Sequence, residues 1–191
     1  VGFGIVIPIL PLYADELGAS GFMIGLVTAS FAFTQFFFAP FWGNLSDRIG
    51  RKPVLLISIG IMGFSYLLFS QANTLWLLLT SRMLAGVGAA NISAANAYIS
   101  DITTPENRSK NFGLIGAAFG LGFIFGPPLG GFLKDNYGIE YVGFVSASLA
   151  ALNFVLAFFL LPESLKEKNK NASLVPNPFG EFKAILHRKE I

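Results

Sequence analysis

Cysteine is absent from the sequence and histidine occurs once, and these shortages exclude several kinds of chemistry. A chain without cysteine forms no disulfide, carries no thiol nucleophile and offers no cysteine ligand to a metal. His187, the one histidine, lies in a polar tail, so the residues for a histidine metal site or a catalytic dyad are lacking. We therefore expect no metal, no cofactor and no enzymatic activity.

Charged side chains are also scarce, at 13% of the 191 residues. A soluble domain carries roughly a quarter charged residues, so a soluble globular fold is not expected. The uncharged runs are long, and each is close to or above the roughly 20 residues that cross a hydrocarbon core of about 30 Å. They cover residues 17–46, 53–81, 83–100, 111–133 and 141–162. The sequence therefore predicts an all-α, polytopic membrane bundle.

Charge gaps and turn residues divide the chain into six predicted transmembrane helices. They are expected at 1–13, 22–42, 54–71, 75–98, 113–133 and 141–161, with a tight hairpin at the polar residues 71–74. The first helix is short, since 13 residues rise only about 20 Å. It has no basic region before it and no small-residue cleavage site, so we interpret it as a truncated membrane helix rather than a signal peptide. Residues 1–161 are expected to form one six-helix transmembrane unit.

The basic residues predict the orientation of this unit. Eleven of the 13 Lys and Arg residues fall on one side of the predicted bundle, whereas Lys134 falls on the other and Arg82 lies within a helix. Because basic loops stay in the cytoplasm, we expect these loops and the amino terminus to be cytoplasmic in a multi-pass cell-membrane protein. This topology explains the positive charge better than nucleic-acid binding, so no nucleic-acid partner is expected.

Residues 162–191 are expected to form a cytoplasmic linker. An apolar stripe among its charges indicates either an amphipathic interfacial helix over 179–191 or a plain linker. The stripe consists of Phe179, Phe182, Ile185 and Leu186.

An internal repeat divides the six predicted helices into two groups of three. The pattern G-x-L-x-D-x-x-G begins at Gly43, after the second helix, and again at Gly131, 88 residues later and after the fifth. Since three is an odd number, the second group must be inverted in the membrane relative to the first. Inverted three-helix repeats are a construction that secondary transporters use. The alternative is coincidence, because short helix hairpins often contain Gly and Asp.

The first copy of the repeat continues into a charged motif. It reads G-x-x-x-D-R-x-G-R-K and is made by Gly43, Asp47, Arg48, Gly50, Arg51 and Lys52. Its glycines permit a chain reversal, and alone it would fit an ordinary positive-inside loop. The complete motif resembles the cytoplasmic signature of the major facilitator superfamily. Asp101, at the end of the fourth helix, resembles the acidic partner of this loop, which implies a pairing with Arg51.

Arg82 lies about seven residues inside the fourth predicted helix, where a cation is costly and normally faces a cavity or a partner. In a continuous helix Ala85, Gly86, Ala89, Ser93 and Asn96 fall near its face and predict a small, polar-lined groove. A structural arginine bonded to backbone carbonyls is the alternative. The surrounding residues resemble the family's R-x-x-Q-G-x-G-x-A motif, whose arginine is associated with proton coupling. Ala85 stands where that motif has Gln.

The fifth predicted helix carries glycines at intervals of four, which allow a neighbouring helix to approach closely. Its prolines remove amide donors and are expected to bend or loosen the helix. The run G-x-x-x-G-P-x-x-G-G is formed by Gly122, Gly126, Pro127, Gly130 and Gly131. It resembles the antiporter motif of the family's drug:proton branch. Residues 2–11 similarly resemble the first helix of the twelve-helix multidrug and tetracycline exporters.

The resemblance implies twelve helices in two halves that rock about a central cavity, with this chain as the amino-terminal half. It implies export of small amphipathic compounds in exchange for protons, with the lipid bilayer and a missing carboxy-terminal six-helix half as partners. Gln35, Ser93 and Asn96 are candidates to line the substrate cavity. We expect a fragment, the alternative being a half-size protein that pairs. A family member that moves sugars or other metabolites, and a non-transporting scaffold or receptor, are the rival functions.

Overall fold

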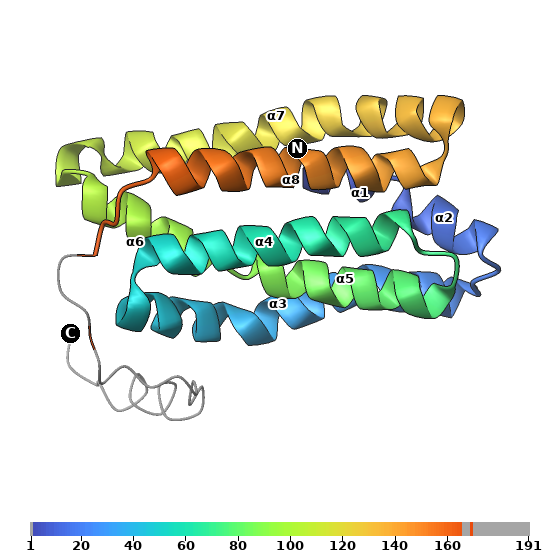
Figure 1. The fold of residues 1–191 in the computed structure, drawn as a ribbon, viewed down its shortest axis with the longest axis horizontal. Helices are drawn as coiled ribbons and strands as arrows, with labels where there is room; N and C mark the ends of the chain where they lie inside the picture. Colours follow the sequence, from blue (N-terminus) through green and yellow to red (C-terminus); the bar gives the residue numbers. More distant parts are fainter. Residues whose placement is uncertain (1, 166–168, 170–191) are drawn as a thin grey trace, which may run out of the picture.

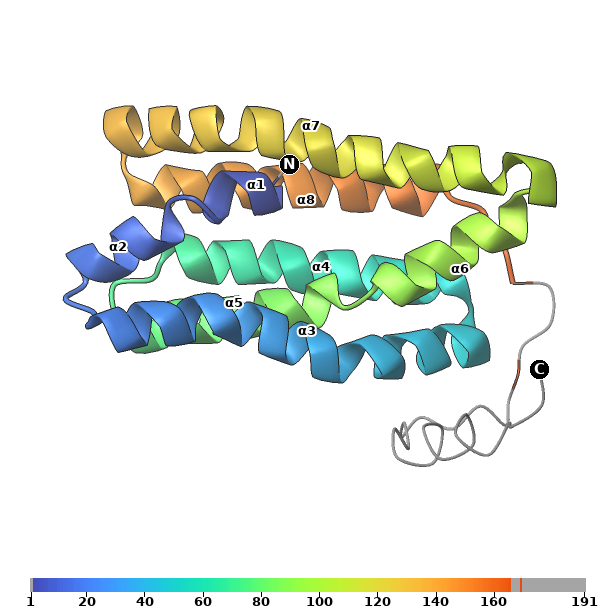
Figure 2. The same cartoon turned by 180° about the vertical axis from the view of Figure 1, so that it is seen from behind.

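The computed structural model describes residues 2–165 and residue 169, and within these residues the fold is entirely helical. Figures 1 and 2 show a bundle of long, roughly parallel helices seen from opposite sides. The elements are α1 (Gly2–Val6), α2 (Leu10–Glu16), α3 (Gly21–Ile49), α4 (Arg51–Ser70), α5 (Leu75–Ala89), α6 (Ile92–Ile102), the 3-10 turn η1 (Pro105–Asn107), α7 (Arg108–Tyr137) and α8 (Ile139–Leu160).

Five helical segments of the described chain are long and apolar enough to cross a membrane. They are Gly21–Ile49, Arg51–Ser70, Leu75–Ile102, Pro105–Tyr137 and Ile139–Leu160. These correspond to the second to sixth predicted helices, and the predicted class of an all-α membrane bundle is confirmed. The helix and linker alternatives for residues 179–191 lie outside the described residues.

The first predicted helix is not continuous. It is divided into α1 and α2 by a turn at residues 7–9, and α2 has Pro11 in its first turn. Pro8 and Pro11 lack the amide donors that a continuous helix would need there. The sequence motif that identifies this helix therefore also explains its break.

The fourth predicted helix is also broken, which the sequence did not predict. α5 ends at Ala89 and α6 begins at Ile92, with Ala90 and Asn91 forming a turn between them. Side chains of α3 accommodate the break, because Trp42 Nε1 donates to the carbonyl of Val87 at 2.7 Å. Gln35 Nε2 donates to the carbonyl of Ala89 at 3.2 Å. Carbonyls that a helix break releases must find donors in an apolar environment, and α3 supplies them.

Two single glycines join the longest helix pairs. Gly50 links α3 to α4 with φ of 118°, and Gly138 links α7 to α8 with φ of 99°. L-amino acids with a side chain rarely adopt this region, so each link requires glycine. The two glycines occupy the same position in the predicted repeat, and they lie at opposite ends of the bundle (Figure 1).

The helix contacts agree with two inverted three-helix units. The first unit consists of α1–α2, α3 and α4, and the second of α5–α6, α7 and α8. α1 packs on α7, α5 packs on α3, and α4 packs on α8. A two-fold relation between the units replaces α1–α2 by α5–α6, α3 by α7 and α4 by α8. It therefore turns the contact of α1 with α7 into that of α5 with α3, and it leaves the contact of α4 with α8 unchanged.

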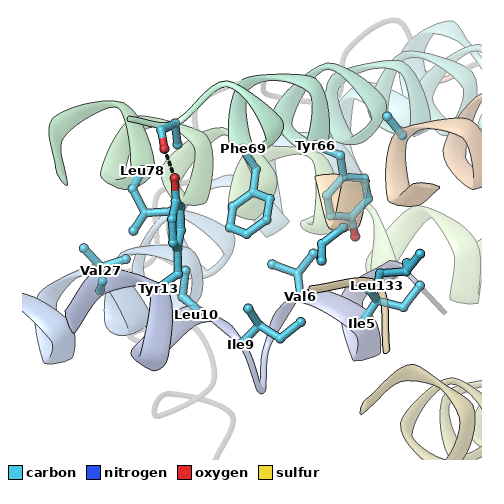
Figure 3. Close-up of a cluster of buried hydrophobic side chains, with 14 of the residues drawn as sticks. Ile5, Val6, Ile9, Leu10, Tyr13, Val27, Tyr66, Phe69, Leu78 and Leu133 are labelled. Atoms are coloured by element: carbon cyan, nitrogen blue, oxygen red, sulfur yellow. Dashed lines mark hydrogen bonds between the residues drawn. The ribbon is translucent and has the colours of Figure 1, made fainter. Parts of the chain in front are cut away.

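The apolar core joins the broken first helix to its neighbours (Figure 3). The Tyr13 ring meets Phe69 edge to face at 5.9 Å, and the Tyr13 hydroxyl donates to the carbonyl of Ala72. Ile5, Val6, Val27 and Leu78 are fully buried in the same cluster. This packing ties α2 to the hairpin at residues 71–74, which forms where the sequence predicts it.

Buried serines in the helices satisfy themselves locally. Each donates its hydroxyl proton to the carbonyl three residues earlier, so these hydroxyl groups are paired within their own helices. The members are Ser30, Ser58, Ser65, Ser70 and Ser81. Ser146 is the exception within the described chain, since its buried hydroxyl has no hydrogen-bond partner.

Candidate functional site

The α3–α4 link brings Asp47 and Arg51 together. The Arg51 guanidinium lies 2.6 Å from Asp47, and the same nitrogen donates to the Ser46 hydroxyl. The Arg51 side chain is only 10% exposed. A guanidinium removed from water needs charged partners to offset its desolvation, and the reversal at Gly50 supplies the first of them.

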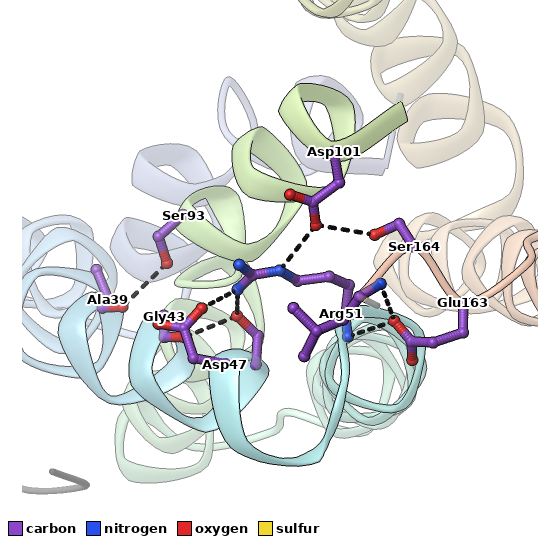
Figure 4. Close-up of polar contacts among 10 residues, drawn as sticks. Ala39, Gly43, Asp47, Arg51, Ser93, Asp101, Glu163 and Ser164 are labelled. Carbon is purple, nitrogen blue, oxygen red and sulfur yellow. Dashed lines mark hydrogen bonds and ion pairs between the residues drawn. The ribbon is translucent and has the colours of Figure 1, made fainter. Parts of the chain in front are cut away.

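Asp101 supplies the second partner. It lies near the end of α6, and its Oδ2 is 3.3 Å from Arg51 Nε. Arg51 is therefore held between carboxylates of α3 and α6 (Figure 4). This is the pairing of Arg51 with Asp101 that the sequence comparison implies. We refer to Asp47, Arg51 and Asp101, together with Ser46, as the charged hub.

Glu163 and Ser164 also contact the hub, and the sequence analysis missed both. Glu163 Oε1 accepts the main-chain N–H of Arg51 at 2.9 Å, and Oε2 accepts that of Lys52 at 3.3 Å. The Ser164 hydroxyl donates to Asp101 Oδ2 at 3.1 Å. A signal was available, because Glu163 is an acid directly after the sixth predicted helix in a segment otherwise rich in bases.

The remaining members of the charged motif pack around the hub. Lys52 Nζ donates to the carbonyl of Phe158 at 2.8 Å and lies 5.6 Å from the centre of that ring, at the end of α8 where a helix dipole favours a cation. Gly43 lies against α6, since a Cβ there would be 3.4 Å from Ser93 Oγ. Arg48 is half-buried in the last turn of α3. The motif therefore connects α3, α4, α6 and α8 at one end of the bundle.

Arg82 does not face the predicted polar groove. It is 3% exposed, and its guanidinium carbon lies 4.9 Å from the centre of the Phe69 ring in α4. Its Nη2 has no hydrogen-bond partner among the described residues. The prediction assumed one continuous helix over 75–98, whereas the break after Ala89 separates Ser93 and Asn96 from the face that carries Arg82.

Gly86 shows how the expected groove is closed. A Cβ at this position would clash with Thr34 and with the carbonyl of Phe31, so α3 lies directly against α5. Thr34 Oγ1 donates to the carbonyl of Met83 at 2.9 Å across the same contact. The small residue next to Arg82 thus serves close helix packing.

The glycines of α7 form a backbone contact with α1. A Cβ on Gly126 would lie 2.7 Å from the Cα of Gly4, and one on Gly130 would lie 2.6 Å from the carbonyl oxygen of Ile5. Gly122 meets Gly4 in the same way. The close approach predicted from the spacing is confirmed. Pro127 and Pro128 lie inside α7, which runs as one helix from Arg108 to Tyr137, and the bending or loosening expected of them stays a prediction.

The three candidate cavity residues have different surroundings. Gln35 and Ser93 each donate to a backbone carbonyl of a neighbouring helix, those of Ala89 and Ala39, and Asn96 is exposed on α6. A cavity of about 470 Å³ lies instead beside the start of α1. Its polar lining comes from Ser58, Tyr66, Asn91, Ser146 and Asn153. A role for Gln35, Ser93 and Asn96 in binding substrate stays a prediction.

The two ends of the bundle differ in charge as the sequence predicts. Arg48, Arg51 and Lys52 lie at the end that holds the hub, together with the start of α7, which carries Arg108 and Lys110. Lys134 lies at the opposite end, where its Nζ is 2.6 Å from Glu16 of α2. The side of a membrane that each end faces stays a prediction.

Comparison with known proteins gives consistent matches along the chain. A sequence model of the family described as Major Facilitator Superfamily matches residues 1–191. The class C tetracycline resistance protein of Escherichia coli is 37% identical over 190 residues, which are 96% of this chain and 47% of that protein. Multidrug resistance protein 2 of Bacillus subtilis (strain 168) is 37% identical, over 90% of this chain and 43% of its own length.

A solved structure matches as well. The crystal structure of the human organic anion transporter MFSD10 superimposes with a TM-score of 0.76 at 27% identity, over 90% of this chain and 47% of that chain. The chain thus spans about half the length of the relatives that it matches.

Proposed function

Because the chain belongs to the major facilitator superfamily, we propose that it is the amino-terminal half of a transporter that exports small amphipathic compounds in exchange for protons. The observation that carries this proposal is the substrate class of its relatives. Proteins named for tetracycline, multidrug and quinolone resistance are 32–37% identical to it over most of its length. The antiporter motif in α7, seated on α1, supports the same direction of transport.

We propose that the charged hub is a latch of the transport cycle. Together with the rest of the charged loop motif, the hub would hold the cytoplasmic ends of the two halves in one state and release them in the other. The proposed latch residues are Gly43, Asp47, Arg48, Gly50, Arg51, Lys52 and Asp101. Rearrangement of ion pairs at an interface accompanies rigid-body rotation between two states, as alternating access requires. The hub end would face the cytoplasm of a cell-membrane protein, in keeping with its basic residues.

Protons would supply the driving force. One proton that moves inward across 100 mV releases about 2.3 kcal/mol, which biases the exchange about fifty-fold. No Asp or Glu lies deep within a membrane-length helix of the described residues. The carboxylate that takes the proton would therefore lie elsewhere in the complete protein or be Asp47.

Arg82 is proposed to tune that proton site. It is buried, and its Nη2 has a free N–H within the described chain. A buried cation favours the ionised form of a carboxylate placed near it. The contact with the Phe69 ring would hold the Arg82 guanidinium in position while the nearby carboxylate gains and loses its proton.

The test uses the full-length protein in liposomes with an imposed acid gradient. We expect uptake of a cationic dye such as ethidium, and of tetracycline, with a matching loss of the gradient, and no movement of labelled sugars. Arg82→Ala should remove proton-coupled flux while substrate binding persists. Sugar transport would favour the metabolite alternative, and the absence of any flux would favour a non-transporting membrane protein.

Organic anions form a second candidate substrate class. The structural match is to a protein named as an organic anion transporter, and the buried cation Arg82 suits a negative charge. A pair of dyes with similar ring systems and opposite charge, measured in the same liposomes, separates the two classes.

A further inference from the structure

Glu163 supplies the cap that the start of α4 lacks. The first N–H groups of any α-helix have no partner within the helix, and Gly50, at the N-cap of α4, has no side chain to cap them. The carboxylate of Glu163 accepts the N–H groups of Arg51 and Lys52 from a position 112 and 111 residues away in the sequence. A negative charge at this end also complements the helix dipole.

Gly50 leaves the space for this carboxylate. A Cβ on Gly50 would lie 2.9 Å from the Cδ of Glu163 and would clash with Oε2. Gly138, the matching glycine of the second repeat, has a similar φ but nothing within 4 Å of a Cβ. Conformation explains both glycines, and contact with Glu163 is an additional requirement at Gly50 alone.

Glu163 and Ser164 together hold the main chain and the side chain of Arg51 in place. Glu163 bonds the main chain of Arg51, while Ser164 bonds the carboxylate oxygen of Asp101 that also lies 3.3 Å from Arg51 Nε (Figure 4). Asn169 adds a third contact, because its N–H donates to the carbonyl of Asp47 at 3.0 Å. Ser164 and Asn169, which follow α8, thus bond to Asp101 and Asp47, the two acidic residues of the hub.

We propose that Glu163 is a positioning residue of the charged hub. It fixes the first turn of α4 so that the Arg51 side chain lies between Asp47 and Asp101, and the segment after α8 thereby controls how readily the hub opens. The inference rests on the proposed function of the hub as a latch. It assigns to the linker a mechanical part in transport, in addition to joining two halves.

The test compares Glu163→Gln with Glu106→Gln in the full-length protein. Glutamine keeps one acceptor oxygen and turns an N–H donor towards the other main-chain N–H, so one cap bond is lost and the charge removed. Glu106 is a matched control, since it is an exposed acid in η1 and has no ion pair within the described chain. Glu163→Asp, which retains the charge but is one methylene shorter, should give an intermediate result.

Two readouts separate the contact from its consequence. Hydrogen–deuterium exchange, resolved to single residues by overlapping peptides that begin before residue 49, reports the N–H groups of Arg51 and Lys52, and Pro53 contributes none. We expect exchange there to be about tenfold faster in Glu163→Gln and unchanged in Glu106→Gln. In proteoliposomes the turnover at saturating substrate should fall about fivefold with an unchanged KM, because the latch and not the binding site is altered.

The outcomes decide the proposal separately from the proposed function. Faster exchange with unchanged turnover would make Glu163 only a structural cap, and unchanged exchange would rule out the contact itself. Either result overturns the positioning role. If the wild-type protein moves no compound, the proposed function fails, and with it the role in a latch, while the exchange data still decide whether Glu163 caps α4.

Discussion

The two copies of the G-x-L-x-D-x-x-G repeat have the same backbone and different partners. Each joins two membrane-length helices through one glycine with positive φ, Gly50 in the first copy and Gly138 in the second. Asp47 of the first copy forms an ion pair with Arg51, whereas Asp135 of the second forms none within the described residues. Position 139, which matches Arg51, is an isoleucine. The repeat therefore encodes a chain reversal, and the added charges convert one reversal into a hub.

The removal of Arg51 is the strongest way to test this difference. Arg51→Ala leaves Asp47 and Asp101 without their shared partner, and because these carboxylates are 42% and 29% exposed, water screens the loss to about 1–2 kcal/mol. We expect the efflux rate to fall about 20-fold, which corresponds to about 1.8 kcal/mol. Lys134→Ala removes a base from the second copy of the repeat. Because its ion-pair partner Glu16 is 54% exposed and therefore solvated, this change should lower the rate less than about twofold. Equal losses in the two variants would contradict a special role for the first copy.

The linking glycines should differ in stability when replaced by alanine. Both Gly50→Ala and Gly138→Ala place a side chain in an extended backbone region at positive φ that is essentially restricted to glycine, which costs about 1–3 kcal/mol. Gly50→Ala also forces Glu163 away and should cost about 1 kcal/mol more than Gly138→Ala, since a bond to the α4 terminus is lost. Thermal unfolding of the purified proteins in detergent measures the difference. A lower midpoint for Gly138→Ala would reverse the comparison.

The two aspartates should differ in a smaller way. Asp47→Asn keeps the shape of the side chain but removes its charge beside Arg51, which retains Asp101 as a partner. We expect the rate of proton-driven efflux to fall about fivefold to tenfold. Asp135→Asn, at the matching exposed position, should leave it unchanged. Initial rates at several substrate concentrations, with transporter amount normalised, provide the measurement.

The first glycines of the two copies, Gly43 and Gly131, should show the smallest difference in stability. A Cβ on Gly43 would touch Ser93 at 3.4 Å, whereas a Cβ on Gly131 would meet nothing within 4 Å. Gly43→Ala should change stability by less than about 1 kcal/mol, and Gly131→Ala should raise it slightly, because alanine favours helix. The thermal unfolding midpoints of the two full-length variants in detergent measure both changes. A large loss in Gly131→Ala would indicate that a further part of the protein covers this face.

Much of the fold could be predicted from composition and spacing. Long uncharged runs locate the helices, and the four-residue spacing of Gly122, Gly126 and Gly130 predicts the close contact that α1 makes there. The basic residues separate the two ends correctly. These features are local, or they repeat along the sequence, so a pattern reveals them.

The features that escaped prediction depend on distant partners. Neither Ala90 nor Asn91 is a helix breaker, and the break between α5 and α6 relies on donors from Trp42 and Gln35 in another helix. Arg82 reaches an aromatic ring of α4 that its own helix face does not reveal. Such contacts follow from how whole helices pack.

The contact between α1 and α7 has a mechanical consequence. Gly4 meets Gly122 and Gly126 main chain to main chain, with no side chains interlocked between them. Elsewhere in a protein interior, side chains fit together closely and resist displacement. Beside this seam Phe3 of α1 meets Phe123 of α7 edge to face at 6.0 Å, so an axial shift of α7 along α1 has to carry this ring pair with it, and the two rings limit how far the helices can move.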